Sequence, residues 1–140
     1  MNRVLFVSQR QAEKMRPPAN CALISVTDTD KAKAELSHTW HAILRVAFDD
    51  SDSISFPGAN PELCPLSLWQ ARDIAAFYTS HAAESKRIVV HCRAGISRSA
   101  AIAKAICSST ALPFPEAYNE YNRHVFAVMQ QALREQTSEA

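Results

Sequence analysis

The sequence predicts a single α/β domain whose central, mostly parallel sheet has about four to five strands and carries helices on both faces. Short apolar runs rich in β-branched residues alternate along the chain with segments whose apolar residues recur at helical spacing. This alternation is typical of a parallel sheet, because consecutive parallel strands need a crossover between them. A chain of 140 residues fits one domain, here 1–140, and buries about two-thirds of its unfolded surface.

The first half of the chain predicts three strands and two short helices. Apolar runs give strands at residues 3–7, 21–26 and 43–48. A helix over residues 9–15 ends before two consecutive prolines, which cannot continue it. Aspartate and threonine side chains then offer caps for a helix over residues 31–36, so Asp28 and Asp30 are interpreted as helix caps rather than catalytic acids.

The second half predicts a surface loop, a fourth strand and three helical segments. Residues 53–65 contain three prolines and one glycine and are predicted to form an irregular surface loop. Ser67 and Gln70 have the spacing of a capping box, so a helix begins after Ser67. The strand covers residues 87–91, and helices cover residues 99–107 and, as one broken or two successive helices, 116–134.

One loop carries most of the chemistry, because it joins the fourth strand to an alanine-rich helix. A loop in this position points successive backbone N–H groups into one concavity and adds the positive end of the helix dipole. The sequence therefore predicts an anion-binding cradle. Its residues are His91, Cys92, Arg93, Ala94, Gly95, Ile96, Ser97, Arg98 and Ser99.

Within this loop, Cys92 and Arg98 are the candidates for catalysis. The backbone amides and the Arg98 guanidinium favour the thiolate form of Cys92, which is the nucleophilic form. The guanidinium also presents a planar fork of donors that fits two oxygens of a phosphoryl group. An isolated cysteine is more often a small buried side chain, but an arginine at a helix start is electrostatically misplaced unless an anion joins it. The pair is therefore interpreted as a ligand site, with Gly95 allowing the tight turn.

This loop resembles the phosphate-binding loop of the cysteine-dependent protein tyrosine phosphatase superfamily. The histidine before Cys92, the glycine, and the Ser97-Arg98-Ser99 ending are typical of its compact, dual-specificity-like bacterial branch. The specific match is confined to residues 48–50 and 89–99. The resemblance implies the same fold and a metal-independent protein-tyrosine-phosphatase activity, with Cys92 as nucleophile and no cofactor.

The resemblance also implies roles for two further residues. Ser99 would hydrogen-bond the sulfur and make it a better leaving group when the phosphocysteine intermediate is hydrolysed. The general acid of the family lies upstream on a loop after a strand, and Phe48-Asp49-Asp50 resembles that position. Asp50 is the preferred acid, while Asp49 and Asp52 remain alternatives. His91 is interpreted as a residue that orients the loop through hydrogen bonds.

The predicted function is hydrolysis of phosphotyrosine, with phosphoserine and phosphothreonine left open, in a phosphorylated protein substrate. Arg93 and Arg98 are the only cations of the loop, which favours a singly phosphorylated substrate. One alternative is a phosphoinositide or other small phosphate-monoester phosphatase of the same superfamily. Another is a catalytically weak module that binds phosphoproteins.

Composition limits the partners of the protein. A net charge of +1 gives no reason to expect a nucleic acid or a membrane surface, and we expect a monomer. The four cysteines form no Cys-x-x-Cys pair, so a reduced, cytoplasmic chain is expected. Whether Cys64 or Cys107 pairs with Cys92 is left open. His38 and His41 lack a third ligand in the neighbouring sequence, so no metal site is predicted.

Overall fold

In the computed structural model, which describes residues 3–58 and 60–138, four parallel strands form one sheet in the order β1-β4-β2-β3. All four predicted strands are present, and the prediction of a parallel sheet is confirmed. The central strands are buried almost throughout, as their continuous apolar runs require. The strands are β1 (Arg3–Ser8), β2 (Cys21–Thr27), β3 (Ala42–Ala47) and β4 (Arg87–Cys92).

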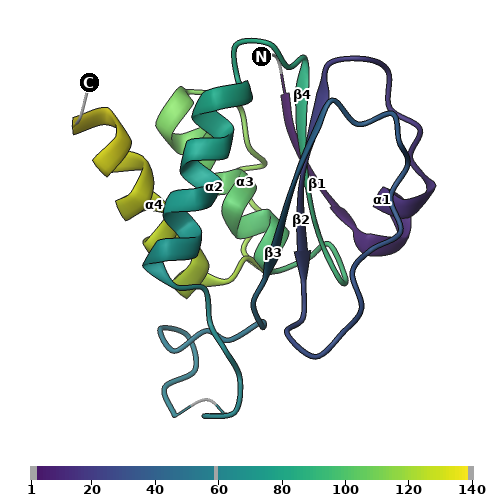
Figure 1. Cartoon of the computed structure of the whole chain (residues 1–140). Helices are drawn as coiled ribbons and strands as arrows, with labels where there is room; N and C mark the ends of the chain where they lie inside the picture. The colour runs from purple at the N-terminus through teal and green to yellow at the C-terminus, as the bar shows by residue number, and fades with distance from the viewer. Residues whose placement is uncertain (1–2, 59, 139–140) are drawn as a thin grey trace.

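Helices cover the two faces of the sheet unequally (Figure 1). Three of them, α2 (Leu68–His81), α3 (Arg98–Thr110) and α4 (Arg123–Ser138), pack on one face and enclose the larger core. The short α1 (Gln9–Lys14) lies on the other face, where Leu23, Val89 and Trp40 belong to a smaller core. The prediction of helices on both faces is confirmed. No helix in the described part of the chain is long and apolar enough to span a membrane.

Two helices begin at capping boxes that are visible in the sequence. Ser8 caps α1 with Gln11, and Ser67 caps α2 with Gln70, each through reciprocal side-chain and backbone hydrogen bonds. The Gln70 side chain also donates to the carbonyl oxygen of Ala47 at 2.7 Å. The start of α2 is thereby fixed to the carboxyl end of β3.

The predicted helix over residues 31–36 is absent, so this prediction was wrong. The segment runs as an irregular loop over the smaller core, where Leu36 packs and where Ala34 is buried. The Arg45 guanidinium donates to the carbonyl oxygen of Ala34 at 3.0 Å, which holds the loop in this path. Six residues form only a marginal helix by themselves, so these tertiary contacts prevail. Asp28 therefore caps no helix.

The last helix is shorter than predicted, because residues 116–122 form a turn followed by irregular backbone and α4 begins only at Arg123. Asn122 accepts a hydrogen bond from the N–H of Val125, as an N-cap side chain does. Asp52, far away in the sequence, accepts from the N–H groups of Arg123 and His124 at 2.8 and 3.2 Å. A carboxylate from another segment thus fixes where this helix starts.

Candidate active site

The predicted cradle lies between β4 and α3, at the edge of the sheet where the parallel strands end. The loops that follow β2 and β3 end at the same edge, so they meet the cradle there. Gly95 has a φ of +73°. A Cβ atom added to it would lie 2.4 Å from the backbone nitrogen of Ser8, so only glycine fits. The junction of β1 and α1 therefore forms the rear wall of the loop.

Cys92 lies at the end of β4 and is 2% exposed. Its Sγ atom is 3.1 Å from the Oγ atom of Ser99 on the first turn of α3. It lines a cavity of about 420 Å³ together with Arg98 and the loop between them. The structure thus brings the candidate nucleophile, its proposed serine partner and the arginine together.

The Arg98 side chain is 4% exposed and is held from one side. Its Nη1 atom donates to the carbonyl oxygen of Phe48 at 2.6 Å and lies 2.8 Å from Oδ1 of Asp28. Its Nε atom is buried and has no hydrogen-bond partner among the residues that the structure describes. An unsatisfied buried donor typically costs about 1–3 kcal/mol. An anion that accepts a hydrogen bond from Nε would satisfy it.

Asp28 is the site residue that the sequence interpretation missed. It follows β2, lines the same cavity, and faces Arg98 at 2.8 Å and Arg93 at 3.7 Å. It was interpreted as a helix cap because the sequence around it has capping residues. Its position directly after a central strand was the available signal, because the carboxyl ends of parallel strands meet at one edge.

Of the three candidate acids, only Asp50 lines the cavity that contains Cys92. Its side chain is exposed, and Oδ1 accepts hydrogen bonds from Ser97 Oγ at 2.9 Å and Asn122 Nδ2 at 2.8 Å. These bonds attach Asp50 both to the cradle and to the start of α4. The Asp50 carboxylate is thus held beside the cavity through Oδ1, and its Oδ2 atom has no hydrogen-bond partner among the described residues.

The neighbouring Asp49 holds two loops together instead of facing the cavity. It is buried and accepts hydrogen bonds from the N–H of Cys64 at 2.8 Å and from the N–H and hydroxyl of Thr29. These bonds, first that of Cys64 and then those of Thr29, lower the pKa of Asp49. Asp49 therefore connects the loops after β2 and β3.

Asp52 also has a structural role, because its carboxylate binds the first N–H groups of α4. Burial opposes ionisation there, but hydrogen bonds from the backbone of Arg123, Ser55 and His124 outweigh it, so the pKa of Asp52 is lowered. A carboxylate that holds a helix start is poorly suited to donate a proton to a leaving group. The geometry favours Asp50 over both alternatives.

His91 is completely buried behind the cradle. Its Nε2 atom is 2.6 Å from the Ser25 hydroxyl, and its Nδ1 atom is 3.3 Å from the carbonyl oxygen of Cys92. Burial lowers the pKa of His91. A neutral imidazole held from both sides suits a residue that orients the loop.

The connection between α3 and α4 supports the cradle from outside, which sequence reasoning did not anticipate. The Tyr118 hydroxyl donates to the carbonyl oxygen of Ile96, and the Asn122 N–H donates to that of Ser97 at 3.1 Å. Tyr118 also packs edge-on against Phe6, with ring centroids 5.1 Å apart. A tyrosine within the predicted helical segment 116–134 gives no sign in the sequence of this polar contact.

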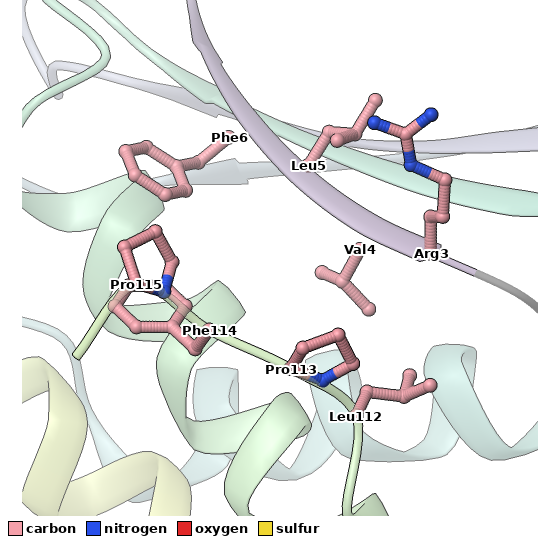
Figure 2. Close-up of a pocket in the computed structure, with 8 residues that line it drawn as sticks. All are labelled: Arg3, Val4, Leu5, Phe6, Leu112, Pro113, Phe114 and Pro115. Carbon is pink, nitrogen blue, oxygen red and sulfur yellow. The ribbon is translucent and has the colours of Figure 1, made fainter.

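A second cavity, of about 290 Å³, lies between β1 and the segment after α3. Figure 2 shows Val4 and Phe6 facing Pro113 and Phe114 across it. Phe6 and Phe114 stack with ring centroids 5.6 Å apart. Its lining has no thiol, carboxylate or imidazole, so it has none of the side chains that the chemistry of the cradle needs.

The fold resembles that of one class of known proteins, the protein tyrosine phosphatases. Human DUSP28 matches with a TM-score of 0.53 and 15% identity, over 98% of this chain and 95% of that chain. Tk-PTP in its active form matches with a TM-score of 0.51 and 16% identity, over 99% and 91%. No protein-family model and no curated protein matches the sequence. The chain therefore has the protein tyrosine phosphatase fold, as the resemblance of its loop predicted.

Proposed function

We propose that the protein is a metal-independent phosphatase that hydrolyses phosphate monoesters, phosphotyrosine first among them, on protein substrates through a phosphocysteine intermediate. The observation that carries the proposal is the arrangement around Arg98. A buried guanidinium with an unpartnered Nε lines the same cavity as Cys92. Both are needed to hold and attack a phosphoryl group.

In the first step the Cys92 thiolate attacks phosphorus in line. The Arg98 Nε and the loop amides hold the equatorial oxygens, where charge develops in the transition state. Asp50 gives a proton to the departing phenolate or alkoxide. Ser97 and Asn122, which both donate to one oxygen of Asp50, leave its other oxygen to carry that proton.

In the second step water hydrolyses the phosphocysteine, and Asp50 takes a proton from that water. The sulfur leaves as a thiolate, which the Ser99 hydroxyl stabilises from the 3.1 Å separation seen in the free protein. The thiolate is thereby restored for the next cycle. Ser99 acts mainly in this step, because the charge on sulfur grows there.

Asp28 positions the guanidinium in this proposal. With Nη1 of Arg98 held by Asp28 and by the Phe48 carbonyl, the remaining donors are directed to the ligand. Asp28 also lies 3.7 Å from Arg93 and offsets part of its charge. The cradle then has little excess positive charge for further phosphates, which favours a singly phosphorylated substrate over a polyphosphoinositide.

A neighbouring cavity of about 220 Å³ supports a protein substrate. It shares Asp50 and Ser97 with the cradle and is also lined by Phe56, which is 70% exposed, and by Arg123. An aromatic ring and a cation beside the site give contacts for the residues that flank a phosphorylated side chain. A small phosphate ester would leave this cavity empty.

The test is hydrolysis of para-nitrophenyl phosphate, with EDTA present throughout, by the wild type and by Cys92→Ser, Asp50→Asn and Cys64→Ser. The proposal requires turnover by the wild type, none by Cys92→Ser, impaired turnover by Asp50→Asn, and unchanged turnover by Cys64→Ser, which alters an exposed thiol outside the cavity. If the wild type is inactive and Cys92→Ser still binds a phosphopeptide, the phosphatase proposal fails and a phosphoprotein-binding module becomes the better account.

A further inference from the structure

A second group of chemically active side chains lies at the opposite end of the sheet from Cys92. His41 directly precedes β3, His81 is the last residue of α2, and Glu84 lies in the turn that follows. One ligand atom from each lies within 4.8 Å of the other two. The His41 N–H donates to the carbonyl oxygen of Cys21 at 2.9 Å, which fixes its backbone against the start of β2.

The spacing of these atoms approaches that of a zinc site. His41 Nε2 is 3.5 Å from Glu84 Oε2. In a tetrahedral site with bonds of about 2.0–2.1 Å, neighbouring ligand atoms are about 3.3 Å apart. One pair is therefore already at nearly the required separation, and the His81 ligand atom lies within 4.8 Å of both other atoms.

His81 gives a second indication of a missing partner. Its Nδ1 atom is buried and has no hydrogen-bond partner within the described residues. The Phe77 ring packs on the imidazole with centroids 4.6 Å apart and restricts its orientation. A plain ion pair between His41 and Glu84, whose side chains are 37% and 68% exposed, would be weak in water and would leave His81 Nδ1 without a partner.

We propose that His41, His81 and Glu84 form a Zn²⁺ site with water as a fourth ligand. Two imidazoles and one carboxylate are a donor set that zinc accepts when one position stays open. The exposure of His41 and Glu84 gives the ion a path from solvent. Because the site lies away from the cradle, the ion ties the segment before β3 to the end of α2 and takes no part in phosphate chemistry. The site does not depend on the proposed phosphatase activity.

The experiment is calorimetric titration of the full chain with Zn²⁺ in a Cys92→Ser, Cys64→Ser background, which removes the two thiols most able to compete for the ion. We expect one equivalent of Zn²⁺ to bind and to raise the thermal midpoint, and Mg²⁺ to do neither. His41→Ala, His81→Ala and Glu84→Gln should each weaken binding by at least about tenfold, the minimum that even an outer-shell change typically causes. His38→Ala is the matched control, because His38 is an exposed histidine outside the cluster.

Cobalt gives an independent readout of the ligand set. Co²⁺ bound to nitrogen and oxygen donors should show tetrahedral d–d bands without a thiolate charge-transfer band, and Glu84→Gln, at an exposed position, should remove them in a folded protein. Three results would overturn the site. The Cys92→Ser, Cys64→Ser chain could show no Zn²⁺ binding, the three ligand variants could bind Zn²⁺ with unchanged affinity, or His38→Ala could lose as much affinity as they do. In the chain that keeps Cys92, hydrolysis of para-nitrophenyl phosphate in EDTA should be the same for the wild type, His41→Ala and Glu84→Gln, which separates this inference from the proposed function.

Discussion

The two ends of the sheet hold reactive side chains in very different ways. At the carboxyl end, the cradle is backed by the β1–α1 junction, supported by Tyr118 and linked through Asp50 to the start of α4. At the amino end, His41 meets His81 and Glu84, which come from the end of α2 and the turn after it, through one ion pair and one ring contact, and His41 and Glu84 are exposed. A change at the carboxyl end should therefore affect folding and turnover together, whereas a change at the amino end should affect ion binding and the stability that the ion adds, and should leave turnover unchanged.

The largest expected effect that tests this difference is on Arg98. Arg98→Lys keeps the charge but loses the fork that reaches the Phe48 carbonyl, Asp28 and the ligand at once. We expect kcat for para-nitrophenyl phosphate to fall by about 10³-fold, the upper range for one lost transition-state donor. Arg93→Lys, at an exposed cation of the same loop, should retain most activity. Retention of a tenth of wild-type kcat by Arg98→Lys would contradict the role given to the guanidinium.

Gly95→Ala should come next, and it acts on stability. The new methyl group would overlap the backbone of Ser8 in a conformation with positive φ, so we expect a loss of about 3 kcal/mol in the free energy of unfolding. Urea denaturation measures it. Gly58→Ala is the matched control, because Gly58 has a φ of +83° and no atom within 4 Å of the added Cβ. Equal losses in the two variants would mean that the rear wall of the cradle is not tightly packed.

Asp50 and Asp28 can be separated at the same cavity. Asp50→Asn removes the proton donor, so kcat for phenyl phosphate, which has a poor leaving group, should fall by about 10²-fold. The fall should be smaller for para-nitrophenyl phosphate, whose leaving group needs less protonation. Asp28→Asn should alter mainly KM, because it releases Arg98 without removing a reacting group. If Asp28→Asn instead lowered kcat and Asp50→Asn changed only KM, Asp28 would be the proton donor and Asp50 the residue that positions Arg98.

The smallest effect is the pH dependence that His91 contributes to stability. Burial lowers its pKa in the folded state, so below about pH 6.5 the unfolded chain takes up a proton that the folded chain does not. Stability should therefore fall as pH falls through this range, by at most about 1.4 kcal/mol per pH unit from one group. Urea midpoints at pH 7.5 and 5.5 measure this. His91→Gln should flatten the dependence, while His38→Gln should leave it unchanged.

Those parts of the site that lie in one contiguous stretch were predictable from the sequence. Cys92, Arg98 and Ser99 belong to one loop whose spacing carries the chemistry, and both capping boxes are local patterns. Their geometry depends on few residues, so short-range rules suffice. The placement of Asp50 required more, because its hydrogen bonds come from Ser97 and Asn122 across the fold.

Other features depended on contacts that no local pattern records. Asp28 was assigned to a helix that tertiary contacts prevent, and the start of α4 is fixed by Asp52 from the loop after β3. His41 was not predicted to be a ligand, because the residues that join it in the proposed site, His81 at the end of α2 and Glu84 in the turn after it, are far away in the sequence. Propensity and spacing act within a few residues, whereas these contacts are set by how strands and helices align.

The contact between Gly95 and Ser8 also links reactivity to the completion of folding. β1 pairs with β4 so that Ser8 lies beside Cys92, although the two strands are far apart in sequence. Closing so long a segment costs entropy, so this pairing is expected to form late. Until β1 docks, the loop lacks its wall, and the Gln9 N–H cannot bond the carbonyl oxygen of Arg93. A partly folded chain would then carry the Cys92 thiol without an organised cradle, so the proposed phosphate chemistry would begin only when the edge of the sheet closes.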